Sequence, residues 1–239
     1  QRMASAGGTT TATVDLGVIT VPLQFWFCRN PGLALPLIAL QYHEVKVVID
    51  FSASLTGTVN LFADYIYLDT DERRRFAQVS HEYLIEQVQL EEFSQVSGAM
   101  TLNFNHPVKE LIWAGVSTAA WGAVNTAAGK FVDVAGGNYH LKLNGHERMA
   151  PRDSKYYTRA QVWQHHTGFG GLDGDSIAVY SFALKPEEHQ PSGTCNFSRI
   201  DNAQLVSSAN TPTNGLYVYA VNYNVLRVMS GMGGLAYSN

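Results

Sequence analysis

The sequence predicts an all-β protein made of antiparallel sheets packed as sandwiches or barrels. Three observations carry this prediction: apolar and polar side chains alternate with a period of two, other runs are apolar on both faces, and turn-forming sequences separate the runs. The turn formers include Asn30-Pro31-Gly32, Gly136-Gly137-Asn138 and Asn144-Gly145. A chain of 239 residues is long enough to bury a sizeable core, as one large domain or two smaller ones.

The alternating runs predict strands with one face in water. Residues 42–51 place apolar side chains mostly at odd positions and charged side chains at even positions, and residues 99–105 and 138–145 repeat the alternation. Other runs are apolar on both faces and predict strands that are covered on both sides. These runs are residues 61–68, 176–184 and 216–229.

One segment between the predicted strands indicates a helix. Asp69, followed three residues later by Glu72, matches an N-terminal capping arrangement, and residues 73–78 are expected to form a short helix. Acidic side chains directly precede three arginines, which favours a locally neutralised connector over a binding site for an anionic partner. The charged residues of this connector are Asp69, Asp71, Glu72, Arg73, Arg74 and Arg75.

The chain is expected to change domain near residue 95, because residues 91–98 are polar and a new set of strands begins near Ala99. Residues 1–95 have room for roughly four or five strands, too few to close a two-sheet sandwich, whereas residues 96–239 hold about seven or eight. The chain begins without Met on a stretch rich in Gly, Thr and Ala. We therefore expect an upstream portion that completes the first domain.

Composition disfavours several classes of function. Nucleic-acid binders usually carry a net positive charge, whereas this chain has a net charge of −4 and a pI near 6.0. Direct nucleic-acid binding is therefore not expected. Charged residues make up 15% of the chain, against roughly 25% in an average soluble domain, which suits a surface covered by neighbouring molecules. No segment resembles a signal peptide or approaches the ~20 apolar residues of a membrane span. Cys28 and Cys195 lack metal or disulfide spacing and are expected to be free thiols, which favours assembly in the cytosol.

No catalytic or metal-binding constellation emerges from the motifs. His43, His81 and His146 are each followed by Glu but lack the second His of a zinc-protease helix, and His165-His166 would point apart on a strand. The signatures of a cupin metal site, a nucleophile elbow and a phosphate-binding loop are absent. Residues 170–175 lack the ligand spacing and closing Glu of a calcium loop. We therefore predict no enzyme activity, no metal and no cofactor.

Two remaining motifs carry little weight. A glycoside hydrolase would need two carboxylates about 5 to 10 Å apart in one cleft, and no motif arranges the available Glu147, Asp173 and Asp175 in that way. Asn196-Phe197-Ser198 is the one N-glycosylation acceptor sequence. It lies among strand-forming residues of a chain that we expect to be cytosolic, so Asn196 is not expected to carry a glycan.

Four blocks of the sequence carry a family resemblance. Residues 21–47 (VPLQFWFCRNPGLALPLIALQYHEVKV), 64–89, 181–203 and 219–239 (YAVNYNVLRVMSGMGGLAYSN) resemble, in order, the major capsid protein of nucleocytoplasmic large DNA viruses. The phycodnavirus, chlorella-virus-like branch is the most similar. Residues 1–20 carry no recognisable part of the resemblance.

The resemblance implies a double jelly roll, which is two eight-stranded sandwiches in tandem, without enzymatic activity or cofactor. Such subunits form homotrimers with a pseudo-hexagonal outline that tile an icosahedral shell. The implied partners are neighbouring capsomers, minor capsid proteins and surface glycans, and the implied location is the virion, after assembly in the host cytoplasm. Family chains carry most of the first jelly roll upstream of Val21. Residues 1–95 would then be the later strands of that sandwich plus the connector, and residues 96–239 the complete second one.

Within this framework the aromatic residues and the chain end gain expected roles. The candidate interface or core anchors are Phe25, Trp26, Phe27, Trp113 and Trp121. The charged connector is expected to lock the two jelly rolls in one relative orientation. The uncharged tail from residue 230 onward is expected to lie against its own domain or a neighbouring subunit, with Met229 and Met232 filling gaps.

Two alternatives stay open. A minor capsid or penton-type paralogue would share the same sequence pattern. A non-catalytic carbohydrate-binding jelly roll would also fit the aromatic content and the lack of a catalytic site. A stable monomer that binds glycans would favour the second alternative.

Overall fold

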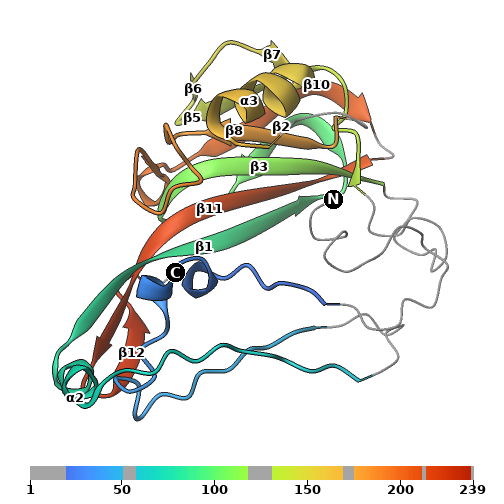
Figure 1. Cartoon of the computed structure of the whole chain (residues 1–239). Helices are drawn as coiled ribbons and strands as arrows, with labels where there is room; N and C mark the ends of the chain where they lie inside the picture. The colour runs from blue at the N-terminus through green and yellow to red at the C-terminus, as the bar shows by residue number, and fades with distance from the viewer. Residues whose placement is uncertain (1–19, 51–57, 118–130, 169–174, 212–213, 238–239) are drawn as a thin grey trace. The chain divides into compact units, whose positions relative to one another are not determined.

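The computed structural model describes residues 20–50, 58–117, 131–168, 175–211 and 214–237 (Figure 1). Short strands and a few helical segments make up the described chain. In order they are η1 (Trp26–Cys28), η2 (Pro31–Leu33), α2 (Thr70–Gln78), β1 (His81–Phe93), β2 (Val96–Leu102), β3 (Pro107–Ser117), β4 (Phe131–Val132), β5 (Asn138–Leu143), β6 (His146–Glu147), β7 (Arg152–Asp153), the π-helix η4 (Tyr156–Ala160), α3 (Gln161–His165), β8 (Ile177–Ser181), β9 (Cys195–Asn196), η5 (Phe197–Arg199), β10 (Ala203–Thr211), β11 (Asn214–Met229) and β12 (Met232–Leu235).

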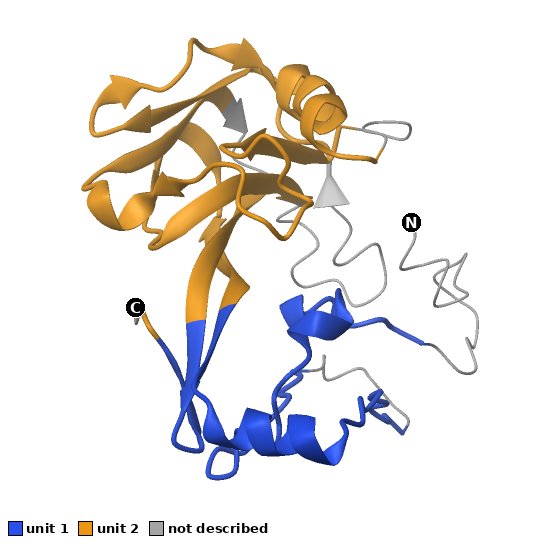
Figure 2. Cartoon of the chain, turned by 60° about the vertical axis from the view of Figure 1, so that its left-hand side comes forward, with its two compact units in different colours: residues 1–83, 226–235 blue, residues 84–225, 236–239 orange. Residues whose placement is uncertain are grey.

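The chain divides into two compact units, which Figure 2 colours separately. Unit 1 comprises Gln1–Tyr83 and Leu226–Leu235, and unit 2 comprises Leu84–Val225 and Ala236–Asn239. The long strands β1 and β11 each contribute residues to both units. The boundary that the sequence predicts near residue 95 remains a prediction.

Unit 2 is a sandwich of antiparallel sheets. One sheet joins β1, β11, β3 and β4 in that order, with β8 and β9 paired to β3. β12 pairs with the part of β11 that belongs to unit 1. The other sheet joins β2, β10, β5 and β6, with β7 paired to β5. Figure 1 shows β1, β11 and β3 side by side. Strands of both sheets supply one hydrophobic core, whose largest fully buried apolar and aromatic side chains include Trp113, Tyr139, Tyr157, Leu111 and Leu216.

Strand β3 is the centre of its sheet. Its residues pair with β11 along most of its length and, in succession, with β9, β8 and β4. Because it has a neighbour on each side, β3 is buried almost continuously, and its two charged residues, Lys109 and Glu110, are buried with it. The periodicity of the sequence did not single out β3 or β10 as strands.

The strands predicted in the first part of the chain are not confirmed. Within residues 42–50 and 58–68 the backbone forms no sheet ladder, and Phe62 and Tyr67 are 90% and 93% exposed. A strand needs a neighbour for its backbone N–H and C=O groups, and the described residues supply none for these two segments. Phe51 itself lies outside the described residues.

The connector prediction is correct for the helix and wrong for the residues after it. Helix α2 starts at Thr70, whose backbone N–H donates to the Asp69 side chain at 2.7 Å. Residues 81–93, for which the sequence pattern predicted no strand, form the 13-residue strand β1. The sequence pattern did not indicate this strand because it contains several Glu and Gln residues, and strands are usually depleted in Glu. The helical segment 156–165 was not predicted either, and it places His165 at the end of a helix rather than on a strand.

The tail folds back on its own chain. Ser230 and Gly231 have φ values of 55° and 83°, as a tight two-residue hairpin turn requires, and β12 then pairs with β11. Further on, the Ala236 N–H donates to the Val225 carbonyl, at 2.8 Å. The expected contact with its own domain is therefore confirmed. Met229 and Met232 are 56% and 58% exposed, so they fill no gap within the described chain, and a gap-filling role toward a neighbouring subunit stays a prediction.

Candidate functional site

The aromatic cluster Phe25, Trp26 and Phe27 lies in unit 1 on the turn η1, not on a strand. The rings of Phe25 and Phe27 stack with centroids 5.0 Å apart, and Trp26 meets Phe27 edge-on at 5.3 Å. Trp26 also lies 6.1 Å from the Tyr83 ring. No residue of η1 is buried, and Phe25 is 38% exposed. The rings therefore support one another while leaving apolar surface open to a partner.

Trp113 lies in the core of unit 2. It is 1% exposed, and its ring centroid lies 5.1 Å from that of Tyr157 and 6.1 Å from that of Tyr139. The Tyr157 hydroxyl donates to the Tyr139 carbonyl at 2.7 Å, so the cluster is also hydrogen-bonded. Burial raises the pKa of the Tyr157 hydroxyl. Trp121 lies outside the described residues.

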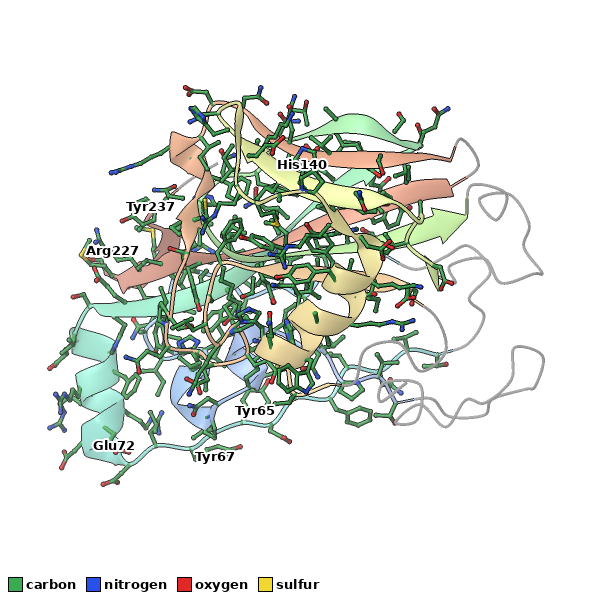
Figure 3. All side chains as sticks on the ribbon, turned by 90° about the horizontal axis from the view of Figure 1, so that it is seen from above. Tyr65, Tyr67, Glu72, His140, Arg227 and Tyr237 are labelled. Atoms are coloured by element: carbon green, nitrogen blue, oxygen red, sulfur yellow. The ribbon has the colours of Figure 1, made fainter. Side chains whose placement is uncertain are left out.

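The charged connector helix α2 buries none of its nine residues, and all of them except the half-buried Phe76 are exposed. Asp71 and Arg74 form an ion pair of 3.8 Å within the helix, and Glu72 extends from it (Figure 3). The helix end is held by His81, whose Nε2 lies 2.8 Å from the Phe76 carbonyl and whose ring stacks on Phe76 at 5.0 Å. The role of the connector in locking two jelly rolls stays a prediction.

Two extended segments of unit 1 expose an unusual amount of apolar side chain. We call residues 42–50 and 58–68 the apolar segments. Figure 3 labels two of their tyrosines. Their exposed large apolar residues are Tyr42, Val45, Val47, Val48, Ile49, Val59, Leu61, Phe62, Tyr65, Ile66 and Tyr67. Apolar surface of this extent marks an interaction site in a stable protein, because its exposure to water is unfavourable.

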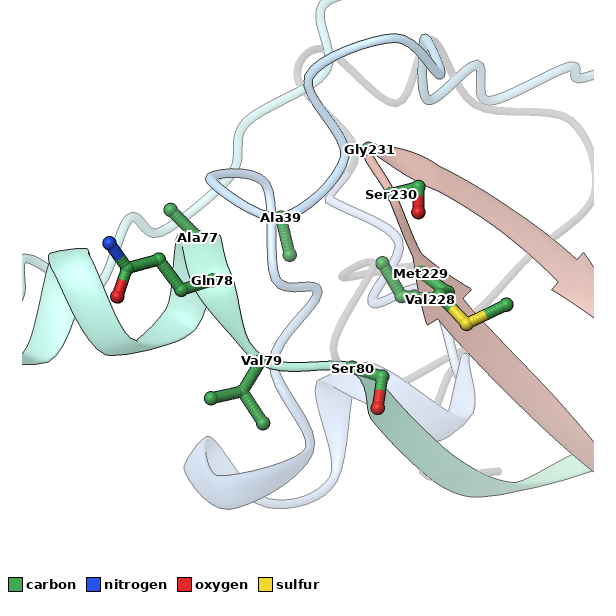
Figure 4. A pocket seen from close by; sticks show the side chains of 9 residues that line it. All are labelled: Ala39, Ala77, Gln78, Val79, Ser80, Val228, Met229, Ser230 and Gly231. Atoms are coloured by element: carbon green, nitrogen blue, oxygen red, sulfur yellow. The ribbon is translucent and has the colours of Figure 1, made fainter.

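A pocket of about 250 Å³ lies in unit 1 between the end of α2 and the β11–β12 turn (Figure 4). Its lining residues are Ala39, Ala77, Gln78, Val79, Ser80, Val228, Met229, Ser230 and Gly231. None of them has an ionisable side chain. Its lining includes the hydroxyls of Ser80 and Ser230 but no acidic or basic side chain that could activate them.

A buried ionic cluster in unit 2 had no signal in the sequence. Lys109 Nζ lies 2.7 Å from Glu86 Oε1, and the two side chains are 2% and 6% exposed. The same ammonium group lies 5.5 Å from the centre of the Tyr223 ring. Burial, together with the charges of Glu86 and Glu110, raises the pKa of Tyr223 to about 12. This tyrosine therefore stays neutral near pH 7.

The second part of this cluster is centred on His166. Its Nε2 lies 3.0 Å from Glu110 Oε2 and its Nδ1 lies 3.2 Å from Glu187 Oε1. The hydrogen bond to Glu110 raises the pKa of His166, and Glu187 adds to the rise, while burial opposes it. Hydrogen bonds from Thr167 hold the pKa of Glu187 below its ordinary value.

Buried amide side chains join β1 to β11. Gln87 Oε1 accepts a hydrogen bond from Asn224 Nδ2, and Gln89 Nε2 donates to Asn222 Oδ1, each at 2.9 Å. The Asn224 amide also donates to the carbonyl of Tyr237 at 2.9 Å. These bonds specify the register of the two long strands and tie the chain end to β11.

The carboxylates considered for catalysis have separate partners. Asp175 accepts two hydrogen bonds from Arg159, each at 2.9 Å, and this pairing lowers its pKa. Glu147 Oε1 lies 3.7 Å from His140 Nε2. Asp173 lies outside the described residues. Within the described parts of the chain, no three or more His, Cys, Asp or Glu side chains are grouped to hold a metal ion.

The glycosylation acceptor sequence has a structural role. Asn196 is exposed, and its side chain accepts the N–H of Ser198 at 3.1 Å at the start of η5. The Ser198 hydroxyl in turn accepts the N–H of His106 at 2.8 Å, and Phe197 is 2% exposed in the core. All three residues of the acceptor sequence are thus engaged in the fold. Cys28 and Cys195 are free thiols, as expected.

None of the described helices is both long enough and apolar enough to span a bilayer. Comparison with known proteins decides the family. The model of the large eukaryotic DNA virus major capsid protein matches residues 72–234, and that of the major capsid protein N-terminus matches residues 1–55. The chain belongs to the large eukaryotic DNA virus major capsid protein family. The second match also covers residues 1–20, which carried no recognisable resemblance in the sequence alone.

Curated relatives agree with this assignment. The major capsid protein of Pyramimonas orientalis virus is 54% identical over 98% of this chain and 66% of its own length. That of Paramecium bursaria Chlorella virus 1 is 41% identical over 92% of this chain and 66% of its own length. The chain therefore spans about two-thirds of the length of these relatives.

Solved structures establish the fold class. The quasi-atomic model of the PBCV-1 virus capsid is 35% identical, with a TM-score of 0.71 over 100% of this chain and 75% of that one. The structure of PBCV-1 VP54 is 36% identical, with a TM-score of 0.72 over 96% of this chain and 74% of that one. These neighbours are double jelly-roll capsid proteins, so the predicted fold class is confirmed.

Proposed function

We propose that this chain acts as a structural subunit of an icosahedral large DNA virus shell and forms homotrimeric, pseudo-hexagonal capsomers. The observation that carries the proposal is the likeness to the PBCV-1 capsid model over the whole of this chain. The role requires no catalysis and no cofactor. The family match favours a major capsid protein over the carbohydrate-binding alternative.

The apolar segments and the Phe25–Phe27 cluster supply surface suited to this role. Obligate assemblies bury a few thousand Å² per interface, with an apolar centre in which aromatic residues provide much of the binding energy. Tyr65 at 68% exposure and Tyr67 at 93% would bury most of their rings in such a contact. Around a closed threefold axis each contact is made head to tail and repeated three times.

The domain organisation belongs to the same proposal. Residues 1–95 would form the later strands of the first jelly roll with the connector, and residues 96–239 the second jelly roll with its tail. The connector side chains Asp69, Asp71, Glu72, Arg73, Arg74 and Arg75 would hold the two in a fixed orientation. A rigid angle matters because a small error in each subunit accumulates over a shell.

The proposed partners are neighbouring capsomers, minor capsid proteins and glycans on exposed loops. We place the protein in the virion, with assembly in the host cytoplasm. Direct contact with nucleic acid is not part of the proposal, because the chain has a net charge of −4.

Light scattering coupled to size-exclusion chromatography tests the proposal through particle mass. We expect a mass of three chains or a multiple of three. Tyr67→Ser should shift the particle toward monomer, while the circular dichroism spectrum stays unchanged. The matched control is Tyr237→Ser, which alters another exposed tyrosine, 60% accessible, outside the apolar segments. A folded chain that stays monomeric at high concentration would contradict the proposal.

A further inference from the structure

The His166 site in unit 2 is a feature that the assembly proposal does not use. His166 directly follows α3, and it lies between Glu110 on β3 and Glu187 in the loop after β8. The side chains of His166 and Glu110 are 18% and 9% exposed, whereas that of Glu187 is 41% exposed. The imidazole thus connects an interior carboxylate to a surface carboxylate.

Glu110 forms an ion pair with His166, and its charge also reaches the Tyr223 hydroxyl, which stays neutral. Ser181, which lies opposite Glu110 on β8, is neutral. The charged and titratable groups on the elements around the ring have partners of their own: Lys109 with Glu86, His165 with the carbonyl of Leu184, Arg159 with Asp175, and Lys185 with Glu188. Of the ion pairs found among the described residues, the pair with His166 is the one that gives Glu110 a cation.

The geometry favours the doubly protonated ring. A neutral imidazole has one N–H and can donate to only one of the two carboxylates, so its lone pair would face the other. The imidazolium carries an N–H on each nitrogen, so it forms an ion pair with Glu110 and donates to Glu187. A buried carboxylate without a cation is costly, so loss of the second proton removes the interaction that makes the burial of Glu110 favourable.

The same site holds the end of α3 to its surroundings. Glu187 accepts hydrogen bonds from the backbone N–H of Thr167 at 3.0 Å and from its hydroxyl at 2.8 Å. Two consecutive residues, His166 and Thr167, thereby attach the helical segment to the loop that contains Glu187. His166 alone extends this attachment to β3.

We propose that His166 is a pH-operated latch: the doubly protonated ring ties the end of α3 to β3 as well as to the loop after β8, and loss of one proton releases the tie to β3. Because the pKa of His166 is raised in the folded chain, the latch contributes its full stabilisation below the ordinary histidine value of about 6.5. That stabilisation is lost as the pH rises through the raised value. Opening is therefore expected on the alkaline side, and it does not depend on assembly.

Two measurements on the whole chain test the latch. In an NMR titration, the His166 ring should hold its second proton to a pH above the ordinary histidine value of about 6.5. In hydrogen exchange corrected for intrinsic rates, the amide protection of residues 161–167 should fall on the alkaline side. The fall should be about tenfold for each unit by which the pKa of His166 is raised. A His166 ring that titrates at or below about 6.5 would overturn the proposal.

Matched variants separate a latch from simple packing. Glu110→Gln should lower the titration point of His166 and remove most of the pH dependence of protection, whereas His165→Gln should leave both unchanged. His166→Lys supplies a cation that persists at alkaline pH, and it should keep residues 161–167 protected there. If Glu110→Gln fails to fold, Glu187→Gln on the exposed side makes the same test with a smaller shift. If the folded Glu110→Gln or Glu187→Gln variant keeps the pH dependence of amide protection seen in the parent chain, the latch is refuted.

Discussion

Replacement of Trp113 by alanine separates a core role from an interface role for this residue. The sequence left both roles open, and the structure encloses the side chain at 1% exposure in the centre of β3. Its neighbours along the sheet are Val218 on β11 and Ala178 on β8. Alanine would leave a large cavity between the rings of Tyr139 and Tyr157, which the surrounding strands can close only in part.

The size of the effect follows from this burial. Removing a buried tryptophan side chain costs about 3–5 kcal/mol in the free energy of unfolding. For a chain of this length, such a loss corresponds to a fall in Tm of roughly 6–20 °C. Phenylalanine should cost less, within about 0.5–3 kcal/mol, because it keeps an aromatic ring in place. It also removes an indole N–H that is buried without a hydrogen-bond partner among the described residues.

Urea unfolding followed by far-UV circular dichroism measures the loss of stability. Light scattering on the same samples, below the unfolding transition, measures association. We expect Trp113→Ala to be far less stable than Trp113→Phe, and both folded variants to associate like the parent chain. An alanine variant with parental stability but weaker association would show that Trp113 acts between chains, and a core role for this residue would be refuted.

Further predictions concern the hairpin turn and an ion pair in unit 2. Gly231→Ala should lower stability by about 1–3 kcal/mol, because Gly231 has a φ of 83° and a Cβ there would overlap the ring of Tyr42. Gly234→Ala is the control, since a Cβ at that position meets nothing within 4 Å, and equal urea midpoints for the two variants would contradict the strain at Gly231. Asp175→Asn should weaken the acid dependence of stability. Because Arg159 holds the pKa of Asp175 below its ordinary value, this carboxylate stabilises the fold above about pH 4 and loses that effect as the pH falls. Urea midpoints that fall equally with decreasing pH in the parent chain and in Asp175→Asn would contradict this prediction.

Helix α2 and the second sandwich show what could be predicted. Asp69 was recognised as the start of a helix because a cap acts on the next few backbone N–H groups and needs no distant partner. Residues 138–143 were recognised as a strand because alternation with a period of two reflects one covered face. The turn at Asn144-Gly145, where both φ values are positive, followed from residue type in the same way.

Strand β1 and the apolar segments show where sequence patterns failed. The Glu- and Gln-rich β1 pairs with β11, and its Gln87 and Gln89 find amide partners there that make a polar strand stable. Residues 61–68 have the pattern of a strand covered on both sides, yet Phe62 is 90% exposed within the described chain. An apolar pattern indicates that a surface is to be covered, but it does not name the covering molecule.

The site residues also divide into those that the sequence pointed to and those that only the structure brings together. Phe25, Trp26 and Phe27 were proposed as anchors from their residue types, which stays a prediction, and the turn that carries them was not predicted. Glu110, His166 and Glu187 come from three separate segments, and no motif joins them. Only the return of the chain from β3 through α3 to β8 brings the two carboxylates within 3.2 Å of the imidazole.

Local order was predictable in parts of this chain: the alternating strand at residues 138–143, the start of α2 and the turn at Asn144-Gly145. These features arise from contacts among near neighbours, so the covalent order of residues already contains them. The pairing of β1 with β11, the burial of Lys109 and the placement of His166 between two carboxylates were not readable. They depend on which distant segments meet and exclude water, and that is set by the packing of the whole sandwich.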